Sequence, residues 1–438
     1  MSSARYIVSG LLEKLEKSAY SNLALDGVLQ SSDVSSRDKA FISRLFYGVI
    51  ERKSTLDYII SLYSSKPLQK LDIQTLNALR MGVYQLLYMD SVPDNAAVNE
   101  SVELIKKLGK KSAAPFVNAV LRSFIRDDKR FALPSDSLQR FCVEYSCSEE
   151  LAKRLIGQYG EDKAAAFLKR SLEPHKLYLR VNNTKTDCDS LIESFVRDGI
   201  TVRKCPILDN CLEAEPFGSV ENNELFRKGF YHVQDLSSQL CCAALEPKKG
   251  EKILDICSAP GGKSFTITEM TGDDCELYAC ELHEKRVKLI RSGAERLGLS
   301  SIKALQNDAK IFNESFPKFD KILCDVPCSG TGVIRSKPEI KYTDLKNAEN
   351  LPNIQYDILK TAAKYLKVGG ELVYSTCTVL KEENELVIDR FLEENGDAFE
   401  GVPFLTEIGA PFGGYKVPII AEGFDCEGFF ISKIRRIC

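Results

Sequence analysis

The chain has 438 residues and a formal net charge of −3, with 44% hydrophobic and 28% charged residues. A chain of this length is too long to fold around a single hydrophobic core, so we expect two or three domains. The composition excludes a disordered or fibrous chain. No apolar run approaches the roughly 18 residues that a membrane helix needs, so we expect no membrane partner. The opening "MSSARYIVSGLLEKLEKS" contains acidic residues, which is not typical of a signal peptide.

The charge is unevenly distributed along the chain. Residues 1–130 hold 19 Lys and Arg against 14 Asp and Glu, so the remaining residues are net acidic. A basic first part is compatible with nucleic-acid binding there, although an excess this small also arises by chance.

Cysteine and histidine usage argues against a metal site. The 15 cysteines begin at Cys142 and form no C-x-x-C pair, and His175, His232 and His283 have no metal-ligand spacing. We therefore expect no metal, no disulfide framework and no histidine-based catalysis, in a protein of the reducing cytoplasm.

Residues 1–130 are predicted to form an all-helical bundle, because apolar residues recur there at intervals of three and four. Ser36 and Asn95 are candidate N-caps. The most basic cluster, "KKLGKK" at 106–111, has a solvated helix end as its simpler interpretation. The next range, 131–240, contains strand-like "LYLRVNNTK" and "ITVRKCPIL" around a helical "DCDSLIESFVRDG", which predicts a small α+β subdomain.

Residues 241–438 alternate between strand and helix. The predicted strands include "EKILDI", "ELYACEL", "IKALQND", "FDKILCD" and "GGELVYST", with helical segments between most of them. This order is typical of a Rossmann-like α/β domain with a doubly wound parallel sheet, whose ligands bind beyond the carboxyl ends of the strands.

The stretch "LDICSAPGGKS" (254–264) ends the first of these strands and opens a helix. Gly261 and Gly262 allow close approach of a ligand, and the helix start offers free amides. Neither a G-x-G-x-x-G dinucleotide motif nor a phosphate-binding P-loop is present, so the turn favours a nucleoside such as S-adenosylmethionine. Glu281 ends the second strand, where it suits the ribose hydroxyls, and Asp308 ends the third, where it suits the adenine amine.

The stretch "DVPCSG" (325–330) places Asp325 and Cys328 at the end of the fourth strand. Cytosine C5 is too weak a nucleophile to accept a methyl group directly, but a thiolate added to C6 makes C5 enamine-like. Asp325 could then hold the N3/N4 edge of the base. Cys377 ends the next strand in "YSTCTV", and both thiols face one pocket if these strands pair. Local chemistry does not decide which thiol attacks.

Four stretches, "LDICSAPGGK", "DVPCSGTGVIRSKPEIKY", "YSTCTVLKEENELVI" and "EGFFISKIRR", resemble the RNA 5-methylcytosine methyltransferases of the Nop2/Sun type, while residues 1–130 resemble the antitermination factor NusB. The resemblance covers essentially the whole chain. It implies S-adenosylmethionine as cofactor, 16S ribosomal RNA as substrate, a NusB-like RNA-binding domain and a monomer. It also implies that Cys377 is the nucleophile and that Cys328 helps to release the product.

The resemblance further assigns cofactor binding by position. Glu281 stands where Asp is common in the family, which lengthens the reach to the ribose, and the remaining departures leave the chemistry intact. The residues expected to bind S-adenosylmethionine are Cys257, Ser258, Ala259, Pro260, Gly261, Gly262, Lys263, Glu281, Asp308 and Asp325.

Several alternatives stay open at this point. A DNA cytosine methyltransferase would be expected to carry a target-recognition domain, and a transfer-RNA enzyme more often carries a different appendage. A non-catalytic RNA-binding assembly factor would not need both thiols. Arg335 and Lys337 are candidate phosphate contacts, and a solvated loop explains them equally well.

Overall fold

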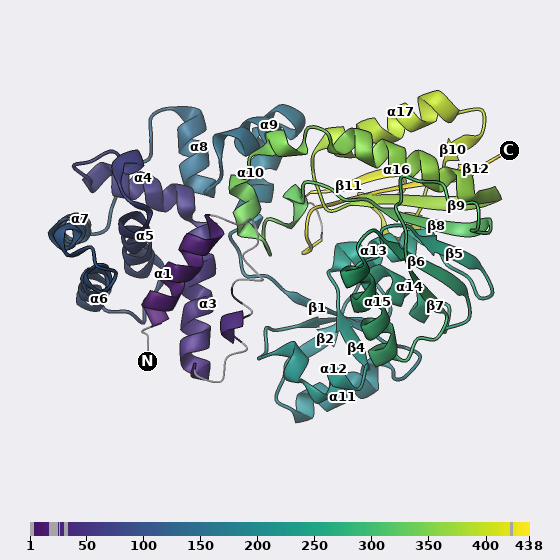
Figure 1. The fold of residues 1–438 in the computed structure, drawn as a ribbon, viewed down its shortest axis with the longest axis horizontal. Coiled ribbons are helices and arrows are strands. Elements are labelled where there is room, and N and C mark those ends of the chain that lie inside the picture. The colour runs from purple at the N-terminus through teal and green to yellow at the C-terminus, as the bar shows by residue number, and fades with distance from the viewer. Residues whose placement is uncertain (1–3, 17–24, 26, 30–33, 421–423) are drawn as a thin grey trace. The chain divides into compact units, whose positions relative to one another are not determined.

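The computed structural model describes residues 4–16, 25, 27–29, 34–420 and 424–438, which fall into two compact units (Figure 1). The first, here called the helical unit, comprises residues 1–173 and 334–344. The second, the catalytic unit, comprises residues 174–333 and 345–438. The segment 334–344 therefore belongs to the helical unit although catalytic-unit residues flank it on both sides.

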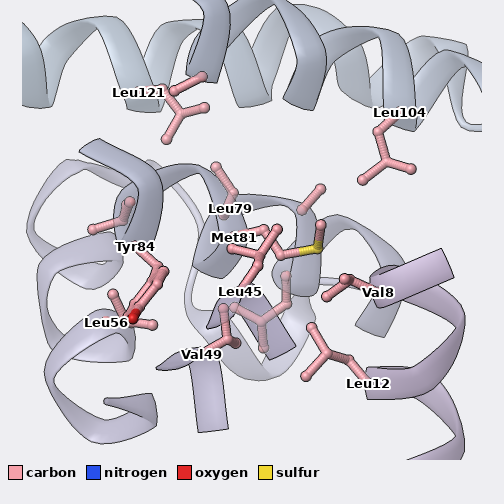
Figure 2. Packing of buried hydrophobic residues seen from close by; sticks show 14 of the residues in the cluster. Val8, Leu12, Leu45, Val49, Leu56, Leu79, Met81, Tyr84, Leu104 and Leu121 are labelled. Carbon is pink, nitrogen blue, oxygen red and sulfur yellow. The ribbon is translucent and has the colours of Figure 1, made fainter. Parts of the chain in front are cut away.

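The helical unit is built around α5 (Ile73–Tyr88), in which every residue from Thr75 to Leu86 is buried. Figure 2 shows Leu79, Met81 and Tyr84 of this helix among apolar side chains of its neighbours. The other helices described in the unit are α1 (Ala4–Leu15), α3 (Ser36–Glu51), α4 (Lys53–Tyr63), α6 (Asp94–Lys107), α7 (Ala114–Arg126), α8 (Ser137–Tyr145), α9 (Glu149–Tyr159) and α10 (Glu161–Arg170).

The helix starts follow local capping chemistry, with small corrections to the predictions. The cap predicted at Ser36 lies one residue earlier, because the Ser35 hydroxyl accepts the Asp38 amide at the start of α3. Asn95 is inside α6, which begins at Asp94 directly after Pro93. The all-helical bundle itself is confirmed. Helices α8, α9 and α10, within the range 131–240, cluster with this unit.

The predicted small α+β subdomain is confirmed as a four-stranded antiparallel sheet in the order β2-β3-β1-β4. Helix α11 (Cys188–Arg197) lies between the first two strands in sequence, and its Leu191 and Phe195 are buried. The strands are β1 (Leu177–Val181), β2 (Val202–Lys204), β3 (Cys211–Ala214) and β4 (Tyr231–Val233), and a short helix α12 (Glu224–Arg227) precedes the last.

The main sheet of the catalytic unit has the strand order β10-β12-β9-β8-β5-β6-β7, with β11 paired to β12. Strands β9, β8, β5, β6 and β7 are mutually parallel, as predicted for a Rossmann-like domain. Strand β12 runs antiparallel to β9 and extends the sheet, so the sheet is mixed. The strands are β5 (Lys252–Asp255), β6 (Glu276–Glu281), β7 (Ile302–Gln306), β8 (Phe319–Asp325), β9 (Leu366–Thr376), β10 (Phe399–Gly401), β11 (Lys416–Ile419) and β12 (Phe429–Arg436).

Helices cover both faces of this sheet (Figure 1). Alternate residues of β5 point to opposite faces, so Ile253 packs with one helix layer and Leu254 with the other. The first layer consists of α13 (Leu236–Leu245), α14 (Gly262–Met270) and α15 (Glu284–Leu297), and the second of α16 (Leu351–Tyr365) and α17 (Glu385–Asn395). The strand order reverses at β5, between β8 and β6, which is where such sheets bind ligands.

Candidate active site

The turn between β5 and α14 forms the first wall of the site. Gly261 adopts φ 111°, a left-handed value that favours glycine, and a Cβ atom there would lie 2.4 Å from the Phe265 ring. The Ser264 hydroxyl donates to Asp255 at 2.6 Å. Burial raises the pKa of Asp255 to about 7, although the Ser264 hydroxyl opposes the shift. The turn is therefore fixed from beneath by a buried carboxyl group.

Lys263 and Asp325 form an ion pair that links this turn to the end of β8. The Lys263 ammonium lies 2.7 Å from Oδ2 of Asp325, and Ser375 donates to Oδ1 at 2.7 Å. Burial opposes the charge of Lys263, but the adjacent Asp325 carboxylate raises its pKa above the ordinary value. Both oxygens of Asp325 are thus oriented by neighbours from β9 and α14.

The acids at the ends of β6 and β7 lie beside a hollow of about 500 Å³. Its lining includes Asp308 together with Leu282 and Ile311, whose side chains are 48% and 65% exposed. Glu281, directly before Leu282, accepts the His283 amide and pairs with Arg286 at 3.0 Å. Two exposed apolar side chains beside an acid offer the faces and the polar edge that a nucleoside needs.

The two thiols singled out in the sequence lie 3.2 Å apart, sulfur to sulfur. Strands β8 and β9 are paired with Asp325 opposite Ser375, so the residues that follow them, Cys328 and Cys377, leave the sheet side by side. The hydrogen bond to Cys377, followed by burial, raises the pKa of Cys328 well above the ordinary value of a thiol. The two sulfurs are therefore within hydrogen-bonding distance, and either of them can be the donor.

Arg335 and Lys337 lie in the segment 334–344 of the helical unit. Lys337 is exposed, while Arg335 is half-buried and donates to the Glu173 carbonyl at 3.3 Å. Two later residues anchor the segment. The fully buried Lys341 donates to the Glu51 carbonyl at 2.8 Å, and the Tyr342 hydroxyl donates to the Ser146 carbonyl at 2.8 Å.

The helical unit also contains an arginine-lined hollow of about 420 Å³, which the sequence did not reveal. Arg5, Arg37 and Arg44 line it and no acidic residue does. Arg5 lies over the ring of Phe41 at 4.9 Å, and Arg44 donates to the Tyr88 carbonyl at 2.8 Å. Arg37 and Arg44 are exposed. The three arginines come from α1 and from positions about two turns apart on α3, so only the folded bundle brings them together.

Two other kinds of site are absent from the described ranges. No group of three or more His, Cys, Asp or Glu residues there could hold a metal ion. Among the described helices, none is long and apolar enough to cross a membrane.

Comparison with known families matches three consecutive parts of the chain. Residues 2–126 match the NusB family, residues 149–221 the RsmF/B-like ferredoxin-like domain, and residues 242–435 the family described as 16S rRNA methyltransferase RsmB/F. These matches confirm the NusB-like first part and the methyltransferase last part.

Known relatives and solved structures match all or most of the chain. The probable ribosomal RNA small subunit methyltransferase B of Bacillus subtilis (strain 168) is 38% identical over 443 residues, 99% of each chain. The crystal structure of PH0851 superimposes with a TM-score of 0.84 at 23% identity over 99% of each chain. NSun6 from Pyrococcus horikoshii with SFG superimposes with a TM-score of 0.62 at 23% identity, over 66% of this chain and 98% of that one.

Proposed function

Because the chain belongs to the 16S rRNA methyltransferase RsmB/F family, we propose that it transfers a methyl group to C5 of a cytosine in 16S ribosomal RNA. The proposal rests above all on the two thiols 3.2 Å apart beside Asp325. A methyltransferase for an exocyclic amine needs no thiol, whereas a ring carbon needs covalent activation. Two thiols at adjacent strand ends suit a reaction in which one attacks and the other assists release.

The residues around the strand ends fit S-adenosylmethionine, which supplies an electrophilic methyl group when bound. The exposed Leu282 and Ile311 suit the faces of adenine, with Asp308 near its amine. Glu281 suits the ribose hydroxyls, and the loop from Cys257 to Lys263 suits the remainder of the cofactor. The solved structure that contains SFG has a similar fold over 66% of this chain.

Cys377 is proposed as the nucleophile. Its sulfur adds to C6 of cytosine, the C5–C6 double bond opens, and the electron pair becomes available at C5 for the methyl group. The hydrogen bond to Cys377, followed by burial, raises the pKa of the Cys328 thiol. The attack is assigned to Cys377 because it is the thiol of the Thr-Cys turn, the nucleophile that the family resemblance implies.

Asp325 is proposed to hold the base during this addition. Its carboxylate, oriented by Lys263 and Ser375, can accept a hydrogen bond from the N4 amine of cytosine. Lys263 balances the charge nearby, so the site stabilises the electron density that moves into the ring.

Release reverses the first step. Solvent accepts the C5 proton, the electron pair of the C5–H bond restores the C5–C6 double bond, and the C6–sulfur bond breaks with its electron pair on Cys377. We propose that Cys328 assists this elimination, since it lies 3.2 Å from the leaving sulfur.

RNA binding is proposed for the helical unit. The arginine-lined hollow offers the exposed guanidinium groups of Arg37 and Arg44 beside the ring of Phe41, which suits phosphate and a stacked base, while Arg5 pairs with Glu100 at 3.7 Å. Lys337 is exposed and suits a phosphate contact, whereas Arg335 is already engaged with the Glu173 carbonyl.

Bisulfite sequencing of ribosomal and transfer RNA, from cells with and without this protein, tests the function. We expect one cytosine of 16S RNA to lose its protection when the protein is absent. A protected site lost only from transfer RNA would redirect the proposal to that substrate. No lost site, together with altered subunit assembly, would support a non-catalytic assembly factor.

A further inference from the structure

A single buried carboxylate, that of Glu383, joins the two loops that carry the thiols. Glu383 lies five residues after the Thr-Cys-Thr turn (376–378) in the sequence, and it is 1% exposed. The Ser329 amide and the Gln355 side chain donate to Oε2, each at 2.9 Å. The hydroxyls of Ser329 and Thr378 donate to Oε1 at 2.5 and 3.2 Å.

These donors are the immediate neighbours of the two sulfurs. Ser329 follows Cys328, and Thr378 follows Cys377. The hydroxyls of Ser329 and Thr378 lie 2.9 Å apart, and Thr331 adds a third hydroxyl 2.7 Å from that of Thr378.

Gln355, from helix α16, ties the network to the proline of the first loop. Its amide contacts the Pro327 carbonyl at 3.0 Å as well as Glu383. The backbones of the two loops also meet directly, because the Gly332 amide donates to the Cys377 carbonyl at 3.0 Å. Glu383 is thus the acceptor on which both thiol loops converge.

We propose that Glu383 is a positioning residue that holds the Cys328 and Cys377 sulfurs in register for attack and release, an inference that rests on the proposed function. The reason lies in the hydrogen-bond inventory. A carboxylate accepts four hydrogen bonds and donates none, whereas a glutamine would present an NH₂ group to donors already aimed at that position. Burying a carboxylate is costly unless all its partners are in place, so the network favours one arrangement of both loops.

Thiol labelling tests the positioning without requiring RNA. All 15 cysteines are free thiols in the described structure, so iodoacetamide followed by peptide mass spectrometry reports on each one. In the full-length Glu383→Gln protein, labelling of Cys328 and Cys377 is expected to accelerate roughly tenfold as their loops open locally. Cys211 and Cys280, buried elsewhere in the catalytic unit, are expected to label at the wild-type rate. The matched control is Glu393→Gln, an exposed glutamate of α17, which should change none of them.

Kinetics provide the second readout. With 16S RNA, kcat of Glu383→Gln is expected to fall roughly 10- to 100-fold, while KM for S-adenosylmethionine stays near the wild-type value. Unchanged labelling of both thiols, or equal acceleration at all cysteines, would overturn the positioning role. Methylation by Glu383→Gln at the wild-type rate would also overturn it. A wild-type protein that methylates no cytosine would instead overturn the proposed function, and the labelling result would still decide whether Glu383 holds the thiols.

Discussion

Cys328 and Cys377 are chemically alike, and their sulfurs lie 3.2 Å apart, within hydrogen-bonding distance. The hydrogen bond to Cys377, followed by burial, raises the pKa of the Cys328 thiol well above its ordinary value. This contact between the sulfurs is invisible in the sequence, where both residues simply follow a strand, and their separate roles are tested by substitution.

Substituting each thiol separately is expected to give opposite results. Cys328→Ala should accumulate a covalent protein–RNA adduct, because addition proceeds and release fails, whereas Cys377→Ala should form none. A denaturing gel with labelled 16S RNA and S-adenosylmethionine separates adduct from free protein. Cys438→Ala, at an exposed cysteine, serves as the control and should behave as the wild type. An adduct trapped by Cys377→Ala would reverse the two roles.

Part of the site could be predicted because it depends on strand ends alone. The carboxyl ends of parallel strands share one edge, so Glu281, Asp308 and Asp325 could be grouped from the alternation of strand and helix. The sequence could not assign Arg286 and Glu383 to the site, because their contacts depend on how a helix and a turn fold back onto that edge.

At the scale of elements, the parallel core of the sheet was predictable but its antiparallel extension was not. Strand β12 was recognised by resemblance only. It pairs Phe430 with Thr376, residues far apart in the chain, and it lies beyond a stretch rich in glycine and proline that gives no periodic signal. Pairing between such distant segments leaves little trace in local sequence.

The segment 334–344 is a second element whose contacts the sequence alone did not reveal. It directly follows the Pro-Cys loop, so the predicted domain 241–438 includes it, yet it clusters with the helical unit. The short 3₁₀ turn Pro338–Tyr342 contributes the buried Lys341 to that unit, and this lysine carries a testable consequence.

Burial lowers the pKa of Lys341 to about 8, with Glu51 opposing the shift, whereas an unfolded lysine titrates near about 10.4. Below pH 8 Lys341 is protonated in both the folded and the unfolded state, so burying its charge lowers the free energy of unfolding by the full amount. Between about pH 8 and 10.4 the folded state releases its proton first, so the free energy of unfolding rises with pH by up to about 3 kcal/mol.

Lys341→Met should remove this rise. Amide hydrogen exchange in the helical unit, followed across this pH range in the full-length protein, measures the difference. Lys337→Met, an exposed lysine of the same segment, is the control and should keep the wild-type dependence. If the free energy of unfolding of the wild type and of Lys341→Met changed with pH in the same way, the lowered pKa of Lys341 would be contradicted.

At the scale of the whole molecule, the net charge of −3 conceals a basic site. The arginine-lined hollow was not predictable, because Arg5, Arg37 and Arg44 are separated in sequence and become neighbours only in the folded bundle. The cluster 106–111, more basic in sequence, does not line this hollow.

Charge reversal in the hollow is expected to weaken RNA binding without affecting cofactor binding. Arg37→Glu and Arg44→Glu should each raise the Kd for 16S RNA and reduce the slope of log K against log salt by about 1. Filter binding at several salt concentrations measures both. Arg122→Glu, at an exposed arginine of α7 outside the hollow, is the matched control. An equal loss of RNA affinity in all three variants would indicate a general charge effect. Unchanged RNA affinity in Arg37→Glu and Arg44→Glu would exclude the hollow as an RNA-binding site.

The excursion of the chain at 334–344 also changes how the molecule can be cut. The backbone passes between the two units at 173–174, at 333–334 and again at 344–345. A protease that nicks only the first junction therefore separates residues 1–173 covalently from the rest, and they stay attached through their noncovalent packing on segment 334–344. A fragment spanning residues 174–438 would carry Ile334, Pro338 and Lys341 away from the surfaces that bury them. Neither unit can be obtained intact by a single cleavage.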